Sequence, residues 1–252
     1  MMRVMIYIPL APQTPRIYAR TLSSVLTLQW PHPVELVLGR EDNVNGMHKY
    51  QNLTLKYNRA RQMALDGGYD ALMTVESDMI LPPLALERMS RIDADVIYGL
   101  YVSRHGKRKW LAFDHIDASG YGASLSDVPE EAARSWGLVR KTAGVGMGCT
   151  FIRRPVLEAL EFRCPETKYA NDWYFSLDCT EHGFVQKHDL GIVCGHIQGA
   201  PDPKILWPEQ NGGYSVEFFD DDNRDRVKLD GYQVDITRLG TLELYPPPME
   251  AA

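Results

Sequence analysis

The chain has 252 residues, of which 44% are hydrophobic and 24% are charged, and it carries a formal net charge of -6. This composition is ordinary for a globular protein, and the negative charge argues against broad electrostatic attraction to nucleic acid. No apolar run reaches the roughly 18 residues that a helical membrane span needs, and the first residues lack the pattern of a signal peptide. We therefore expect a cytoplasmic protein without a membrane span.

The hydrophobic pattern of the first hundred residues alternates between strand and helix. Strands are predicted at Arg3–Pro9, Val34–Gly39, Ala71–Val75 and Asp95–Val102. Between them, apolar residues recur at helical spacing, which indicates amphipathic helices. This order is typical of right-handed βαβ units, so we predict an α/β, Rossmann-like fold with a mainly parallel central sheet flanked by helices.

The second half of the chain is less regular. Residues 103–142 are polar and glycine-containing, and they include the basic run Arg104–Lys109. A glycine-rich run then leads into a strand near residue 150, and a helix is expected at Asn171–Gly183, before a last strand at His188–Ile197. We predict one domain over residues 1–205 and a C-terminal extension over residues 206–252, which is rich in Pro, Asp and Gly.

Two carboxylates follow the third predicted strand, in the segment "ALMTVESDMILPP". Alternation along an extended chain puts Glu76 and Asp78 on the same side. Two converging carboxylates repel each other unless a cation lies between them, and a hard divalent ion such as Mg²⁺ or Mn²⁺ suits oxygen ligands. The alternative is that both side chains face water where a strand meets a loop.

Four segments together resemble a glycosyltransferase of the GT-A fold, of the family-2 type. They are "YDALMTVESDMILPP", "VGMGCTFIRRPVLEAL", "NDWYFSLDCTEHGF" and "IVCGHI", in that order, and the resemblance covers about residues 3–200. In that family an Asp-x-Asp motif after a buried strand binds a divalent metal on the diphosphate of a nucleotide-sugar. The resemblance therefore implies a GT-A fold and metal-dependent sugar transfer.

The resemblance also implies a role for each matching residue. Asp78 matches the direct metal ligand, Glu76 stands where the family has its first Asp, and His196 matches a late histidine that completes the metal site. The expected ion is Mn²⁺ or Mg²⁺. Asp172 matches the general base, in a pair that reads Asn171-Asp172 here. The alternatives are that Asp172 caps a helix and that the histidine is a structural residue of a strand.

The donor is expected to be a nucleotide-diphospho-sugar, with a UDP-sugar favoured. Pro9 and Asp42 lie where this fold places its nucleobase pocket. Asn58 and Arg61 lie on the helix before the carboxylate strand, where a solvated helix face is equally consistent. The residues assigned to the donor are Pro9, Ala11, Asp42, Asn58, Arg61, Glu76, Ser77 and Asp78.

The acceptor is expected to bind beside the general base. Aromatic rings stack on sugars and bases, and glycines allow close backbone approach, with core packing and a tight turn as the alternatives. The residues assigned to the acceptor are Trp110, Gly146, Met147, Gly148 and Trp173. The run Arg104–Lys109 is interpreted as a solvated loop or as a site for a phosphate-bearing acceptor, so DNA with a hydroxylated base stays open as a partner.

The sequence thus predicts a metal-dependent, inverting glycosyltransferase that moves a sugar from a nucleotide-diphospho-sugar to a hydroxyl of a glycan, a small molecule or a modified DNA base. Two alternatives stay open. An inactive nucleotide-sugar-binding module could keep the sheet without turnover. A nucleotidyltransferase could share the sheet, although "PLAPQTPRIYAR" lacks the glycine-rich phosphate loop with a lysine that such an enzyme needs.

Overall fold

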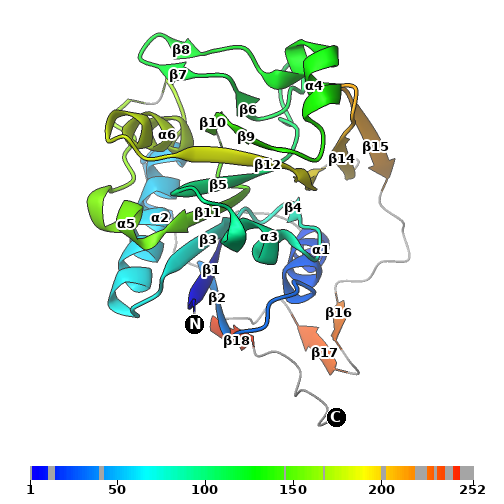
Figure 1. Ribbon diagram of the computed structural model, residues 1–252. Helices are drawn as coiled ribbons and strands as arrows, with labels where there is room; N and C mark the ends of the chain where they lie inside the picture. Colours follow the sequence, from blue (N-terminus) through cyan, green and yellow to red (C-terminus); the bar gives the residue numbers. More distant parts are fainter. Residues whose placement is uncertain are drawn as a thin grey trace.

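The computed structural model describes residues 2–10, 15–39, 43–144, 146–166, 168–199, 203–218, 226–229, 232–235 and 241–244. Side chains are described up to residue 218, except those of residues 15 and 16. Within these ranges a central sheet lies between two layers of helices (Figure 1). No helix in them has both the length and the apolar character that crossing a membrane requires.

The central sheet contains eight strands in the described part of the chain. They are β1 (Val4–Pro9), β2 (Val34–Gly39), β3 (Ala71–Val75), β5 (Val96–Leu100), β9 (Val139–Lys141), β11 (Cys149–Arg153), β12 (Gln186–Val193) and β18 (Thr241–Leu244). Their order is β18-β2-β1-β3-β11-β5-β12-β9. Strands β2, β1, β3, β5 and β12 run in one direction, and β11, β9 and β18 run against them. The predicted α/β fold with a mainly parallel sheet is confirmed.

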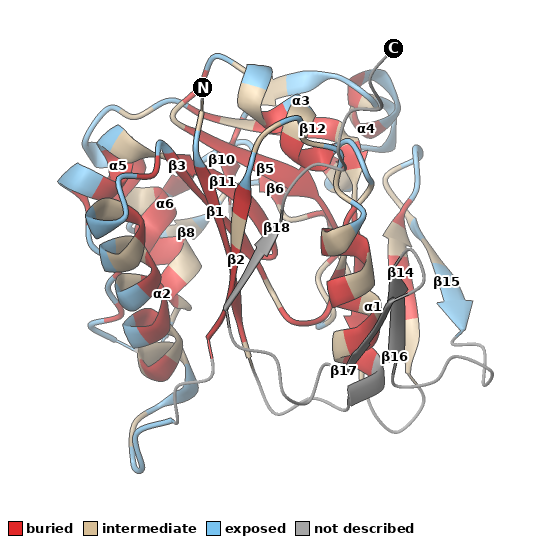
Figure 2. Cartoon of the chain, turned by 90° about the horizontal axis from the view of Figure 1, so that it is seen from below, coloured by how far each residue is buried: buried red, intermediate tan, exposed pale blue. Residues whose placement is uncertain are grey.

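Helices cover both faces of this sheet (Figures 1 and 2). One layer holds α1 (Pro15–Leu26) and α3 (Ala85–Arg91), and the other holds α2 (Lys49–Asp66), α5 (Arg154–Ala159) and α6 (Asn171–Glu181). Alternate side chains of β1 serve the two layers: Val4, Ile6 and Ile8 join the core under α1 and α3, and Met5 and Tyr7 join the core under α2. Burial on both faces explains why the first strand is a continuous apolar run.

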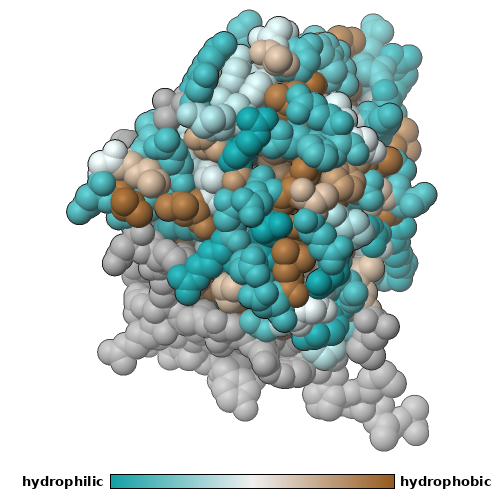
Figure 3. Space-filling model, turned by 90° about the vertical axis from the view of Figure 1, so that its left-hand side faces the viewer, coloured by the Kyte–Doolittle hydropathy of each residue, from teal (hydrophilic) through white to brown (hydrophobic). Residues whose placement is uncertain are grey.

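Helix α2 has an exposed face that is mostly polar, although its Asn52, Thr54 and Lys56 side chains are buried. On α2, Arg59, Gln62 and Asp66 are exposed, whereas Tyr57 and Ala60 are fully buried. Figure 3, which looks from the side that lies at the left of Figure 1, shows a mostly hydrophilic described surface with small, separate apolar patches. The helical spacing found in the sequence therefore reports a helix with one buried face.

A second sheet continues the chain at the carboxyl edge of β3. Its four strands, among the described residues, are β4 (Met79–Ile80), β13 (Gly195–Gln198), β14 (Lys204–Pro208) and β15 (Tyr214–Phe218), in the order β15-β14-β13-β4. The single strand predicted at His188–Ile197 is thus divided between β12 and β13. The predicted boundary at residue 205 lies within β14, and the division into a domain and a C-terminal extension stays a prediction.

Short elements make up the rest of the described chain. The irregular stretch 103–142 contains β6 (Ala112–Phe113), β7 (Ile116–Asp117), β8 (Gly120–Tyr121), the 3₁₀ helix η1 (Leu125–Asp127) and α4 (Pro129–Ser135). β10 (Ala143–Gly144) pairs with β6, and β16 (Arg226–Leu229) pairs with β17 (Tyr232–Asp235). The sequence pattern of this stretch did not predict the helix α4 or the strand β9, which joins the central sheet.

An ion pair fixes α3 to β12. The Arg88 guanidinium donates from Nε and Nη2 to the two carboxylate oxygens of Asp189, at 2.8 and 2.7 Å. The Asp189 side chain is only 2% exposed, whereas that of Arg88 is 42% exposed. The bidentate guanidinium gives both carboxylate oxygens a charge-assisted hydrogen bond, which offsets the cost of removing them from water.

Replacing Arg88 with Ala is expected to lower the free energy of unfolding by about 2–3 kcal/mol, because Asp189 would be left buried without its cation. The measurement is urea unfolding followed by circular dichroism. Arg91→Ala is the matched control on the same helix, since Arg91 pairs with Glu87 at the surface, and its expected cost is below about 0.5 kcal/mol. Equal costs for the two variants would contradict a structural role for the buried pair.

Candidate functional site

The site lies where β3 ends. After Val75 the chain turns, with the Met79 N–H donating to the Glu76 carbonyl at 3.2 Å, and then enters β4. β13 pairs with β4 so that His196 lies opposite Met79, and the Ile197 N–H donates to the Asp78 carbonyl at 2.8 Å. This pairing brings His196 beside Asp78, at the carboxyl edge where ligands bind in open α/β sheets.

Glu76, Asp78 and His196 form a compact group of potential metal ligands. One ligand atom from each lies within 4.8 Å of the others. The His196 Nε2 atom is 3.8 Å from Asp78 Oδ1, and the two side chains are 6% and 5% exposed. Two carboxylates and one imidazole are donors that a divalent cation could use.

The tautomer of His196 is set by a backbone contact. Its Nδ1 lies 2.7 Å from the carbonyl oxygen of Val102, which can only accept, so Nδ1 carries the proton. In the neutral ring Nε2 is then a bare lone pair, and it has no hydrogen-bond partner among the described residues. Burial lowers the pKa of His196 to about 4, so the ring is neutral at pH 7. A buried lone pair therefore points toward a carboxylate, and a cation would satisfy both.

Two carboxyl groups of the site, those of Glu76 and Asp172, have raised pKa values. Burial, and after it the neighbouring Asp78 carboxylate, raises the pKa of Glu76 to about 8. Burial also raises the pKa of Asp172 to about 6, against the opposing effect of the Trp173 backbone N–H. Such perturbed carboxyl groups in one cavity are typical of functional sites.

Arg104 supplies the positive charge beside Asp78. Its Nη1 atom forms an ion pair with Asp78 Oδ2 and lies 3.5 Å from the Ile197 carbonyl oxygen. The Arg104 side chain is 27% exposed, and it comes from the loop that follows β5. The basic run that the sequence offered as a solvated loop or acceptor site therefore contributes directly to the carboxylate cluster.

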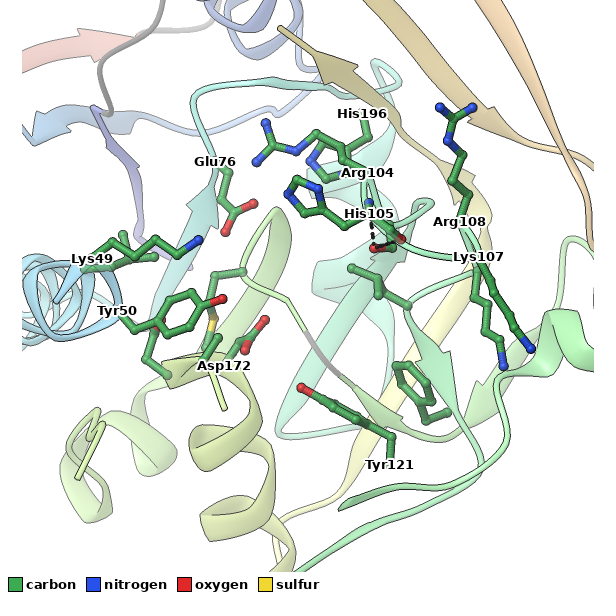
Figure 4. A pocket seen from close by; sticks show the side chains of 18 residues that line it. Lys49, Tyr50, Glu76, Arg104, His105, Lys107, Arg108, Tyr121, Asp172 and His196 are labelled. Carbon is green, nitrogen blue, oxygen red and sulfur yellow. Dashed lines mark hydrogen bonds between the residues drawn. The ribbon is translucent and has the colours of Figure 1, made fainter. Parts of the chain in front are cut away.

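A cavity of about 500 Å³ opens over this cluster. Figure 4 shows Glu76, Asp172 and the Tyr50 hydroxyl pointing into it, with Tyr121 on the far side from Glu76. Asp172 lies in the first turn of α6, half-buried, and its Oδ1 accepts from the Trp173 N–H at 2.7 Å. The carboxylate thus serves the helix start and faces the cavity as well. The residues that line the cavity include Lys49, Tyr50, Glu76, Arg104, Asp172 and His196.

The residues expected to bind the acceptor divide into two groups. Met147 lines the cavity. Trp110 is fully buried and donates from Nε1 to the Gly213 carbonyl at 3.2 Å, and Trp173 is 3% exposed and stacks on Tyr169. Neither tryptophan lines the cavity or offers a free ring face, so the interpretation of both as acceptor platforms is replaced by one of core packing.

The glycines before β11 make room for another side chain. Gly146 has a φ of 101°, and a Cβ atom on it would overlap the hydroxyl of Tyr101. A Cβ atom on Gly148 would lie 2.8 Å from the Tyr101 ring, whose hydroxyl accepts from the Gly148 N–H at 3.1 Å. The close approach expected at these glycines exists, but its partner is Tyr101 of this chain.

Two residues expected at the donor have structural partners instead. Asn58 exchanges two hydrogen bonds of 2.8 Å with the backbone of Phe162, and Arg61 donates to the Leu157 carbonyl at 2.6 Å. Both hold the segment after α5 against α2, and neither lines the cavity. They were assigned to a nucleotide because they precede the carboxylate strand, but α2 turns these side chains toward α5.

The remaining donor residues lie at the strand ends. Pro9 closes β1 and is buried, and Ser77 is 3% exposed, with its carbonyl accepting from the Thr21 hydroxyl at 3.0 Å. Ala11 and Asp42 lie outside the described residues. The nucleobase pocket expected between β1 and β2 therefore stays a prediction.

Several cavity residues were not identified from the sequence, among them Lys49, Tyr50 and Tyr121. Lys49 and Tyr50 lie in the first turn of α2, and Tyr121 lies on β8. The first two follow the loop after β2, so their position beyond a strand end is a signal that could have found them. Tyr121 belongs to the irregular stretch, where no periodic pattern indicates which side chains point inward.

No protein-family model and no curated protein matches the chain. Among solved structures, the crystal structure of A197 from STIV has a TM-score of 0.58 and 16% sequence identity, and the match covers 91% of this chain and 100% of that one. Structures of S. aureus TarS 1-349, alone and in complex with UDP, have a TM-score of 0.45, with 12% and 14% identity. They cover 74% of this chain and 58% and 57% of theirs. The likeness to A197 shows a shared fold.

If Asn58 is structural, Asn58→Ala is expected to lower the free energy of unfolding by about 1–2 kcal/mol and to leave nucleotide affinity unchanged, because the variant loses two partly buried hydrogen bonds to the Phe162 backbone. Chemical unfolding and isothermal titration with UDP give the two readouts. Gln62→Ala is the control, since Gln62 bonds only the exposed Asp66 on the same helix. A loss of UDP affinity without a loss of stability would restore Asn58 to the donor site.

Proposed function

We propose that the protein is a metal-dependent glycosyltransferase of the GT-A type that transfers a sugar from a nucleotide-diphospho-sugar to an acceptor hydroxyl with inversion. The proposal rests on one observation: a group of potential metal ligands and a separate carboxylate lie at the same cavity. Glu76 and Asp78 converge with His196 at the end of β3, and Asp172 faces the same cavity from α6. Both a cation site and a separate base are needed for direct displacement of a nucleoside diphosphate.

The donor set fits a divalent ion. The lone pair of His196 Nε2 and the oxygens of Glu76 and Asp78 offer three ligands of the kind that Mn²⁺ accepts, and they leave positions for diphosphate oxygens. When bound, Mn²⁺ or Mg²⁺ would neutralise the charge that grows on the departing diphosphate. Val102 supports the set because its carbonyl fixes the imidazole in the required tautomer.

Asp172 is proposed as the general base. Its raised pKa leaves it ionised at pH 7 but basic enough to take a proton from an attacking hydroxyl. The acceptor oxygen forms the new bond to the anomeric carbon as the bond to the diphosphate oxygen breaks, and the proton passes to the Asp172 carboxylate. One displacement from the opposite side inverts the anomeric configuration.

The proposal extends to the class of donor and to the places where donor and acceptor bind. A UDP-sugar remains the favoured donor, with its base near Pro9, Ala11 and Asp42. The acceptor hydroxyl belongs between Asp172 and the Tyr50 side chain, in the cavity that Met147 also lines. The basic residues of the loop after β5 keep phosphate-bearing acceptors, including hydroxylated DNA, within the proposal.

A binding module without turnover is the second candidate, because Arg104 already neutralises Asp78. A thermal-shift panel of UDP-, GDP-, CMP- and TDP-sugars, each with and without Mn²⁺, tests both candidates at the donor step. A rise in melting temperature that one nucleotide class causes only with Mn²⁺ supports the metal-dependent donor site. The absence of any shift across the panel would contradict it.

Asp78→Asn and His196→Ala are each expected to weaken Mn²⁺ binding by about tenfold or more, because each removes one ligand from a small set. Titration followed by the electron paramagnetic resonance of free Mn²⁺ gives the dissociation constants, and EDTA is expected to abolish the donor-induced thermal shift. His115→Ala is the control, because His115 lies on an exposed loop beside Asp114. Unchanged Mn²⁺ affinity in either ligand variant removes that residue from the metal site.

Asp172→Asn is expected to slow UDP release from a UDP-sugar by about 10²–10⁴-fold while leaving donor affinity unchanged. In the wild type the rate should be level above pH 7 and fall tenfold per pH unit below about 6, since only the ionised carboxylate accepts a proton and its pKa is raised to about 6.

The charge-matched control is Glu181→Gln at the other end of α6, which is expected to keep the rate within about twofold. A rate that stays level down to pH 4.5, or an active Asp172→Asn enzyme, would rule out Asp172 as the base. Donor binding without any UDP release in the wild type would favour the binding module.

A further inference from the structure

Arg104 lies in the position that a metal ion would share with Asp78. Its Nη1 atom contacts Asp78 Oδ2, while Oδ1 of the same carboxylate faces His196 Nε2 at 3.8 Å. Figure 4 shows the Arg104 guanidinium between Glu76 and His196. Its positive charge also lowers the pKa of the Glu76 carboxyl, against the larger effect of burial. A side-chain cation is therefore already inside the proposed ligand set.

The backbone holds Arg104 there on a short hairpin. Val102 and Trp110 form a bridge, and the Ser103 N–H donates to the Lys109 carbonyl at 2.8 Å, which closes the base of the loop. Gly106 and Arg108 turn the tip with φ values of 62° and 50°. The base is fixed to the core because Trp110 is fully buried, whereas His105 and Lys107 at the tip are exposed. Arg108 ties the tip to the second sheet, because it donates to the Tyr214 hydroxyl at 2.9 Å.

The same hairpin acts on both halves of the ligand set. The carbonyl of Val102 fixes the imidazole of His196, and two residues later the guanidinium of Arg104 neutralises Asp78. A divalent ion bound to Asp78 and His196 would repel a guanidinium in contact with the same carboxylate, because like charges a few ångströms apart oppose each other strongly where water is excluded. A guanidinium at Oδ2 therefore weakens the binding of a second cation at Oδ1 of the same carboxylate.

We propose that Arg104 is an internal competitor of the metal: it occupies Asp78 in the metal-free protein, and metal binding displaces it toward the cavity. This inference rests on the metal site of the proposed function. Once displaced, the guanidinium lies at the rim of a cavity that the diphosphate of the donor is proposed to enter, and it exchanges a carboxylate partner for a phosphate partner. Binding of the metal and binding of the diphosphate then favour each other, because the metal takes Asp78 and the diphosphate takes Arg104.

Mn²⁺ titration of the wild-type protein and of Arg104→Gln, without nucleotide, tests the competition. The glutamine variant is expected to bind Mn²⁺ about fivefold more tightly or better, because no cation has to be displaced. Lys107→Gln removes the same charge from the same loop, and its Mn²⁺ dissociation constant is expected to change less than about twofold, because Lys107 lies in the exposed tip. Equal or weaker Mn²⁺ binding by Arg104→Gln, or equal tightening by Lys107→Gln, would overturn the inference.

A second measurement uses the wild-type protein and so does not depend on how well the variant folds. In nitrogen-15 NMR spectra, the guanidinium N–H signals of Arg104, assigned with Arg104→Lys, are expected to be protected from exchange in metal-free protein and to lose this protection at saturating Mg²⁺. Calorimetry establishes the Mg²⁺ concentration that saturates the site. Protection of the Arg104 signals that persists at this concentration overturns the proposal.

A failure of the competition and a failure of the metal site give different results. Mn²⁺ binding that is measurable and equal in the wild type and in Arg104→Gln refutes the competition alone and leaves the metal site standing. No Mn²⁺ binding by either protein, in the presence or absence of UDP, refutes the metal site and the competition with it.

Discussion

The carboxylate of Asp78 is the constraint on which the rest of the site depends. A charge that is 5% exposed at the end of a strand is costly unless other groups compensate for it. The Arg104 guanidinium, from the hairpin after β5, compensates for this charge through its ion pair with Asp78. β13 closes the second sheet over the strand end, because the Ile197 N–H donates to the Asp78 backbone carbonyl at 2.8 Å, and it places the His196 Nε2 lone pair beside the carboxylate. The burial of Asp78 by the second sheet therefore depends on a cation at the carboxylate.

The hydrophobic periodicity of the sequence predicted those helices and strands whose own residues determine their conformation. The four predicted strands of the first hundred residues match β1, β2, β3 and β5 to within one or two residues. Glu76 and Asp78 both lie within reach of His196, but the chain there forms a turn and not the extended strand on which alternation was argued. The positions of the strands needed only the hydrophobic pattern, and the place of the site needed only the rule that ligand sites form at carboxyl edges.

Residues whose role depends on a tertiary partner could not be assigned in the same way. Asn58 and Arg61 occur on the helix that was expected to face a nucleotide, but their partners are backbone groups near Phe162 and Leu157. Trp110 follows a polar loop, yet its ring is in the core because the hairpin folds back onto β5. Nothing in the spacing of these residues shows which neighbour the fold will bring to them.

The antiparallel strand β11 has a consequence for the time course of folding. It lies between β3 and β5, so the sheet stays divided until the chain has been synthesised beyond Arg153, and the ligand set waits further for His196. Contacts between residues so distant in sequence form late, since the intervening chain must first lose its freedom. On a ribosome, the first three strands would emerge with Glu76 and Asp78 still open to water. The protein thus acquires its buried charge only after most of its core already exists.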